Sequence, residues 1–170
     1  MQFKNIFVIN REKFQSSRKG KIISVGPLED NSGFDLLIRS WVNINEELEI
    51  IGKGTQESML KELIKSNGLE NKIQIEIVDS SEMSSNKFQD AKCLIIPYLK
   101  DENLNLIYQA LNYEIPIIGT NLKEISKIIP KEFLAKPKDV NSLQLVIKEI
   151  IPLLSQFDLS AIKKAVIKNY

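Results

Sequence analysis

The polar stretch at residues 98–103 has the residue types best suited to a binding site. It holds charged and amide side chains and lies between an apolar run at 93–97 and a helically spaced run that ends near residue 113. A second short apolar run follows at 116–120, so the pattern predicts a strand, a helix and a strand. Such units build parallel sheets, which bind ligands beyond the carboxyl ends of their strands. The loop 98–103 is therefore the first candidate site.

The composition excludes several kinds of chemistry. The chain has no histidine, so His-based acid–base catalysis, Ser-His-Asp triads and His-ligated zinc are excluded within it. Its one cysteine, Cys93, lies in an apolar run, which predicts a buried thiol, no intramolecular disulfide and a reduced, cytoplasmic setting. The 23 basic and 22 acidic residues form no long blocks, which favours neither nucleic acid nor an anionic membrane as a partner. No apolar run approaches the roughly 20 residues of a membrane span, and the first residues are too polar for a signal peptide.

The elements that must position the loop follow from the spacing of apolar residues. Short apolar or alternating runs predict strands at 6–9, 21–25, 47–51, 73–77, 93–97, 116–120 and 133–135. Apolar residues at helical spacing predict helices at 34–41, 55–67, 80–90, 104–113, 121–129, 139–154 and 159–170. The strand at 73–77 alternates isoleucine with Gln74 and Glu76, which indicates an edge strand with one wetter face. Asp139 is the expected N-cap of the helix that follows it.

Alternation of strands and helices predicts the fold class. We expect an α/β domain of three layers, α/β/α and Rossmann-like, around a mostly parallel sheet of about six strands. A chain of 170 residues with 43% hydrophobic content fits one compact domain. We divide it into a strand and linker at 1–20, the Rossmann-like domain at 21–156, and a C-terminal helix at 157–170 that packs on it. The loops 27–33, 52–55 and 98–103 should then converge on one edge of the sheet.

Several local strings, taken in order, resemble one family of transferases. In that family a strand leads to a Gly-Arg-Leu loop, and later segments read Leu-x-Ile-x-Gly-x-Gly, a strand ending in proline, Glu-Ala-Met-Ala-x-Gly-x-Pro-Val-Val-x-Thr and Pro-Pro-x-Asp. The corresponding segments here are 25–28, 48–54, 94–97, 109–120 and 136–139. Their order and spacing resemble the C-terminal, donor-binding half of group 1 (family 4) glycosyltransferases of the GT-B fold.

The resemblance covers about residues 6–151 and implies a function. It implies a domain that binds a nucleotide-diphosphate sugar, the donor for hexosyl transfer, with no other cofactor and no metal. GT-B catalysis takes place in a cleft between two Rossmann-like halves. The implied partner is therefore an N-terminal, acceptor-binding half or a partner glycosyltransferase subunit, and the isolated chain should be inactive. The residues that would carry the catalytic step are not assigned.

The same resemblance places the donor site. The family's two glutamates, eight residues apart, fall at Asp101 and Gln109, while its diphosphate-binding arginine and lysine fall at Pro27 and Ser32. Both loop cations are thus absent, and Lys53 and Lys100 are the nearest replacements. The candidate nucleotide-sugar-binding residues are Gly26, Ser32, Gly33, Gly52, Lys53, Gly54, Asp101, Glu102 and Gln109. Replacing Pro27 by arginine and Ser32 by lysine should restore the lost affinity for diphosphate.

Other interpretations remain open at this point. The chain could be a degenerate GT-B-like module that kept the fold and serves as a scaffold for other proteins, or an unrelated doubly wound domain. The glycines at 52 and 54 could simply end a strand and permit a turn. Lys53 and Lys100 could be solvated surface lysines, and Glu124, which falls at a family glutamate, could simply favour a helix N-terminus.

Overall fold

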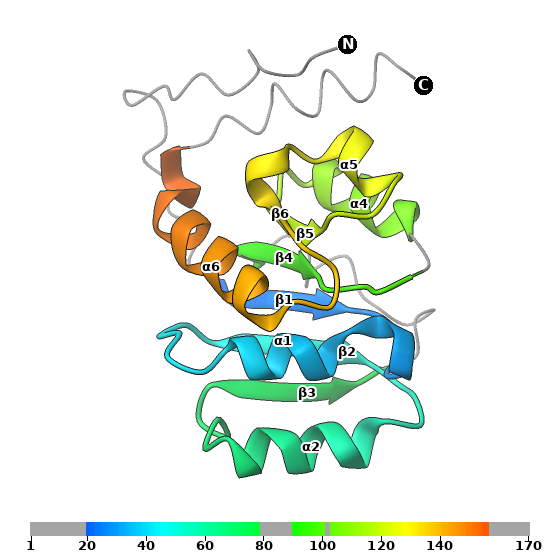
Figure 1. Cartoon of the computed structure of the whole chain (residues 1–170), viewed down its shortest axis with the longest axis vertical. Helices are drawn as coiled ribbons and strands as arrows, with labels where there is room; N and C mark the ends of the chain where they lie inside the picture. Colours follow the sequence, from blue (N-terminus) through cyan, green and yellow to red (C-terminus); the bar gives the residue numbers. More distant parts are fainter. Residues whose placement is uncertain (1–19, 79–89, 101–102, 157–170) are drawn as a thin grey trace.

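A six-stranded sheet forms the middle layer of the molecule (Figure 1). This computed structural model describes residues 20–78, 90–100 and 103–156. The sheet order is β3-β2-β1-β4-β5-β6, and every neighbouring pair is parallel. The strands are β1 (Ile22–Val25), β2 (Leu48–Gly52), β3 (Ile73–Ile77), β4 (Cys93–Ile96), β5 (Ile117–Thr120) and β6 (Leu134–Ala135). The predicted α/β Rossmann-like fold is confirmed.

The described helices lie against the sheet. They are α1 (Phe34–Ser40), α2 (Glu57–Ser66), α4 (Leu104–Asn112), α5 (Ile125–Ile128) and α6 (Val140–Ile150). Short 3-10 turns span Asp30–Ser32, Lys131–Phe133 and Ile151–Gln156. Helix α1 contacts both α2 and α6 on one face, and right-handed crossovers between parallel strands place α4 on the other. The sheet order reverses direction at β1, so β1 and β4 mark the switch point where such folds bind ligands.

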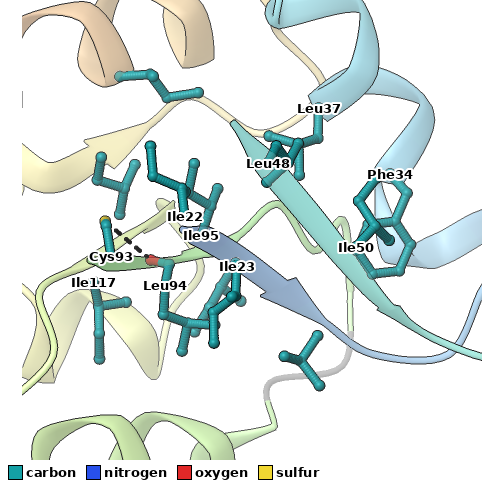
Figure 2. Close-up of a cluster of buried hydrophobic side chains, with 14 of the residues drawn as sticks. Ile22, Ile23, Phe34, Leu37, Leu48, Ile50, Cys93, Leu94, Ile95 and Ile117 are labelled. Atoms are coloured by element: carbon teal, nitrogen blue, oxygen red, sulfur yellow. Dashed lines mark hydrogen bonds between the residues drawn. The ribbon is translucent and has the colours of Figure 1, made fainter. Parts of the chain in front are cut away.

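The core lies on both faces of the central strands. Every residue of β1, β4 and β5 is buried, because helices cover both sides of these strands. Figure 2 shows Leu94 and Ile95 of β4 among side chains from the neighbouring strands and α1. Cys93 is fully buried, as predicted, and burial raises the pKa of its thiol to about 12. Phe34 and Trp41 are also core residues, at 2% and 0% exposure.

The edge positions follow the predicted pattern. β3 is an outermost strand, as predicted, and on its polar face Gln74 is exposed and Glu76 is half-buried. Asp139 caps α6 as expected: its carboxylate accepts a 2.8 Å hydrogen bond from the Ser142 N–H.

Two helix boundaries were predicted wrongly. Helix α6 ends at Ile150, not Leu154, and continues as a 3-10 turn. Pro152 lacks the N–H that an α-helix would need there, so the tighter turn replaces it. Helix α5 begins at Ile125 instead of residue 121, because the Asn121 N–H bonds the Ala135 carbonyl at 2.8 Å and so continues the pairing of β5 with β6.

Three predicted elements lie outside the described residues: the strand and linker at 1–20, except for Gly20, the helix at 80–90, except for Asp90, and the helix at 157–170. Within the described ranges, no helix combines the length and the apolar character that crossing a bilayer requires.

Candidate functional site

The loops after the parallel strands meet at the carboxyl edge of the sheet and form two adjoining hollows. We call the first the amide hollow. It has a volume of about 470 Å³ and is lined by Val25, Gly26, Pro27, Ile51, Gly52, Lys53, Val78, Asn103, Asn105, Leu106 and Gln109. We call the second the loop hollow. It has a volume of about 540 Å³ and is lined by Pro27, Glu29, Asn31, Ser32, Tyr98, Lys100 and Asn103. Pro27 and Asn103 line both, so one extended ligand could span the two.

The amide hollow combines apolar and amide surfaces. Its apolar lining comes from the ends of β1 and β2, from Val78 beyond β3, and from Leu106 of α4. Helix α4 also contributes Asn105 and Gln109, whose amides can donate and accept hydrogen bonds. Among the described residues that line it, Lys53 alone carries a formal charge. This chemistry suits a flat, uncharged group with a few hydroxyl or amide functions.

Asn103 fixes the start of α4 at the border between the hollows. Its side chain accepts a 3.3 Å hydrogen bond from the Leu106 N–H, so it is the N-cap of the helix. Gln109 lies farther along the same helix, exposed, on the wall of the amide hollow. Of the three site residues predicted in this segment, Gln109 lines the amide hollow, whereas Asp101 and Glu102 lie outside the described residues.

Two predicted glycines are required by the protein's own packing. A Cβ at Gly52 would lie 1.9 Å from the Gly26 carbonyl oxygen, so only glycine lets the ends of β1 and β2 approach this closely. Gly33 has φ 71°, and a Cβ there would lie 2.0 Å from the Pro97 carbonyl oxygen. Gly26 lines the amide hollow beside Tyr98 and Gly54 packs against Leu28. These contacts within the chain explain the glycines without a ligand.

Ser32 points into the protein. Its side chain is 5% exposed, and its hydroxyl donates a hydrogen bond to the Pro27 carbonyl oxygen. The hydroxyl's single proton is therefore engaged, and the oxygen can only accept a further bond. An acceptor gives no help in binding a phosphate. Ser32 lines the loop hollow, but its hydrogen bond to the Pro27 carbonyl stabilises the loop itself.

Glu29 joins the loop after β1 to the loop after β2, a link that the sequence did not predict. Its two carboxylate oxygens accept hydrogen bonds from the Thr55 N–H at 2.9 Å and the Thr55 hydroxyl at 2.6 Å. The bond from the Thr55 hydroxyl is the main reason that the pKa of this carboxyl lies below its ordinary value. Next to it, Asp30 accepts a 2.6 Å bond from the Gln56 amide. The Glu29 carboxylate thus stands, ionised at neutral pH, on the wall of the loop hollow.

Tyr98 fills the space where β1 and β4 end. It is 4% exposed, its hydroxyl donates to the Val25 carbonyl oxygen, and burial raises the pKa of that hydroxyl. A Cβ at Gly26 would lie 2.7 Å from the Tyr98 hydroxyl oxygen. The Thr120 hydroxyl in turn donates to the Tyr98 backbone carbonyl. Tyr98 therefore ties together the carboxyl ends of three strands, and it lines the loop hollow beside the switch point.

Glu124 lies away from both hollows. It precedes α5 without capping it, and its carboxylate pairs with Lys127 at 2.6 Å. The hydrogen bond from Lys127 is the main cause of its lowered pKa. In the described part of the chain, no group of three His, Cys, Asp or Glu side chains is placed to hold a metal ion.

Comparison with known proteins decides the family. The sequence profile of glycosyl transferases group 1 matches residues 19–154. The chain belongs to this glycosyltransferase family. Protein CapJ of Staphylococcus aureus is similar to this family member, with 29% identity over 163 residues that cover 88% of this chain and 41% of CapJ.

Two solved structures share the fold of this group 1 glycosyltransferase chain. S. aureus TarM, determined with fondaparinux, α-GlcNAc-glycerol and UDP, matches with a TM-score of 0.76 at 17% identity, over 93% of this chain and 35% of TarM. The C-terminal domain of the group 1 protein LpcC from Francisella tularensis matches with a TM-score of 0.74 at 17% identity, over 88% of this chain and 86% of that domain. The chain thus spans less than half the length of CapJ and TarM, as one half of a GT-B glycosyltransferase does.

Proposed function

We propose that this chain is the donor-binding half of a glycosyltransferase and binds a nucleotide sugar across the amide and loop hollows. The observation that carries the proposal is their position at the carboxyl edge of a parallel sheet, beside the switch point at β1. Four segments that are distant in the sequence meet there. Gln109 can hydrogen-bond a ribose hydroxyl in the amide hollow, and the sugar would extend toward Lys100 and Tyr98.

We also propose that the acceptor is bound by a separate half. The chain spans 41% of CapJ, which leaves room for a second domain of similar size in a relative. One wall of a cleft can neither align an acceptor with the donor nor exclude water from it. The isolated chain should therefore bind its donor without transferring sugar.

The second candidate function is a scaffold that retains the fold without the chemistry. Pro27 and Ser32 favour it, because they stand where the family resemblance places two cations. Ser32 also has its hydroxyl engaged within the loop. In a scaffold the two hollows would have no ligand of their own, and neither would bind a nucleotide.

Calorimetric titration with UDP and GDP separates these two functions. The donor-binding proposal predicts weak but saturable binding of at least one of the two. Replacing Gln109 by alanine should weaken that binding by about fivefold, because one hydrogen bond to the ligand is lost. The matched control Asn141→Ala changes an exposed amide on α6 away from both hollows and should leave the affinity unchanged. Absence of binding by both nucleotides in the folded wild-type chain would favour the scaffold.

A further inference from the structure

Several hydrogen-bond donors in the loop after β1 are absent or already engaged within the protein. Pro27 has no N–H, and the Ser32 hydroxyl donates to the Pro27 carbonyl. The backbone N–H groups of Gly26, Leu28, Glu29 and Ser32 donate to the carbonyls of Ile51, Lys53, Pro27 and Glu29 at 2.9 to 3.0 Å. A phosphate-binding loop instead directs such N–H groups outward at the anion.

The formal charges of the described residues that line the loop hollow cancel. Among its described lining residues, Lys100 is the only cation and Glu29 the only anion. The Glu29 carboxylate is held in place by Thr55, and its lowered pKa keeps it ionised at neutral pH. Asp30 adds a second carboxylate on the same loop. A diphosphate entering this hollow would thus meet repulsion from Glu29 that offsets the attraction of Lys100.

The amide hollow has the opposite character. Asn105 and Gln109 offer amide donors and acceptors, and Val25, Ile51 and Leu106 offer apolar surface. Planar, uncharged rings with hydroxyl and carbonyl groups find partners on both kinds of surface. The nucleoside end of a donor therefore fits this hollow without any help from charge.

We infer that this site recognises its donor by the uncharged nucleoside, and that Glu29 removes the gain in affinity that a diphosphate normally supplies. The inference rests on the proposed donor-binding function and specifies which part of the donor that site recognises. The remaining attraction for the phosphates comes from Lys53, Lys100, the Asn31 amide and the first turn of α4, and Glu29 acts against it. Glu29 is then a specificity-determining residue, although it occupies none of the positions that the family resemblance singles out.

Calorimetry with two ligand series tests the inference on the intact 170-residue chain. The series are uridine, UMP and UDP, and guanosine, GMP and GDP, at one fixed ionic strength. In the series that binds, we expect the three dissociation constants to agree within about fivefold, since the phosphates meet balanced charges. A diphosphate that binds more than about fivefold tighter than its nucleoside would overturn the inference and leave the donor-binding function standing. If no compound binds, both proposals fail.

The variant Glu29→Gln tests the role of the carboxylate. Glutamine keeps an acceptor for the Thr55 N–H but removes the negative charge, so the loop connection is preserved. We expect it to tighten UDP or GDP binding by about threefold and to leave the nucleoside unchanged. The control Glu70→Gln removes an exposed carboxylate near the amino ends of the strands, and should change neither affinity. An equal effect of Glu29→Gln on nucleoside and diphosphate would mean that Glu29 acts through loop structure alone, which contradicts the inference.

Discussion

Glu29 and Thr55 form a two-point connection between the loop after β1 and the turn before α2. Both carboxylate oxygens of Glu29 accept hydrogen bonds from Thr55, one from its backbone N–H at 2.9 Å and one from its hydroxyl at 2.6 Å. Thr55 immediately precedes Gln56, the N-cap of α2, so the Glu29 carboxylate lies near the amino end of this helix. A carboxylate there also interacts favourably with the helix dipole. This connection holds Glu29 on the wall of the loop hollow, and it predicts how stability depends on pH.

Stability should decline on acidification partly through Glu29. Its folded-state pKa is lowered below the ordinary value of 4.5, so the ionised form favours the folded state. The contribution is present above that ordinary value and is lost as the pH falls through the folded-state pKa. Thermal melts between about pH 6 and pH 3 should therefore show a shallower fall in Tm for Glu29→Gln than for the wild type. Parallel Tm curves for the two proteins would argue that the Thr55 bonds contribute nothing to stability.

Adding a cation at Pro27 should create phosphate binding. Pro27 is exposed and lines both hollows, so an arginine there can reach a diphosphate at their border. We expect Pro27→Arg to tighten UDP or GDP binding by about tenfold at low salt, measured by calorimetry, and less at high salt. The control Ser66→Arg places the same charge at the exposed C-terminal end of α2, remote from both hollows, and should have no such effect. If both variants tighten nucleotide binding equally, the gain in affinity comes from net charge, and the predicted phosphate contact at Pro27 is wrong.

The structure separates two positions that the sequence treats as equivalent. Sequence resemblance suggests restoring charge at Pro27 and Ser32 together. Ser32 is 5% exposed with its hydroxyl on the Pro27 carbonyl, so a lysine there would have to push its ammonium out of a buried place. Pro27→Arg alone is therefore the cleaner experiment.

Gly52 should be intolerant of even one added methyl group. A Cβ would lie 1.9 Å from the Gly26 carbonyl oxygen, so the ends of β1 and β2 would have to separate. We expect Gly52→Ala to destabilise the fold by more than about 2 kcal/mol and to weaken nucleotide binding in the amide hollow. The control Gly119→Ala places its Cβ 3.5 Å from Ile125, an ordinary contact, and should cost much less. Chemical denaturation of the two variants checks this, and equal stability losses would show that the close approach at Gly52 is not limiting.

Periodicity predicted the elements of this fold because it reflects burial, which is repeated along the chain. The fully buried strands β1, β4 and β5 and the wetter β3 all appear where the pattern of isoleucines places them. The end of α6 was missed because one missing N–H, at Pro152, outweighed a continuing apolar stripe.

The site was harder to predict than the fold. The predicted helix after the fifth apolar run places Gln109 near the carboxyl ends of the strands, and Gln109 does line the amide hollow. The roles of Ser32 and Glu29 depend instead on where a hydroxyl or a carboxylate points across loops, which no spacing in the sequence encodes. The Thr55 partner of Glu29 lies 26 residues away along the chain. Pairs of this kind become visible only once the loops are folded together.

The most direct measurement of the central claim is a map of ligand-induced amide shifts in the NMR spectrum of the 15N-labelled chain. Titrated with UDP, or with GDP if that is the nucleotide that binds, the chain should show its largest shifts at Gly26, Gly52, Asn105 and Gln109, around the amide hollow. Residues at the amino ends of the strands, such as Glu70, should remain unchanged. Shifts concentrated away from the carboxyl edge of the sheet, or no shifts with either nucleotide, would contradict the assignment of this chain as a donor-binding half.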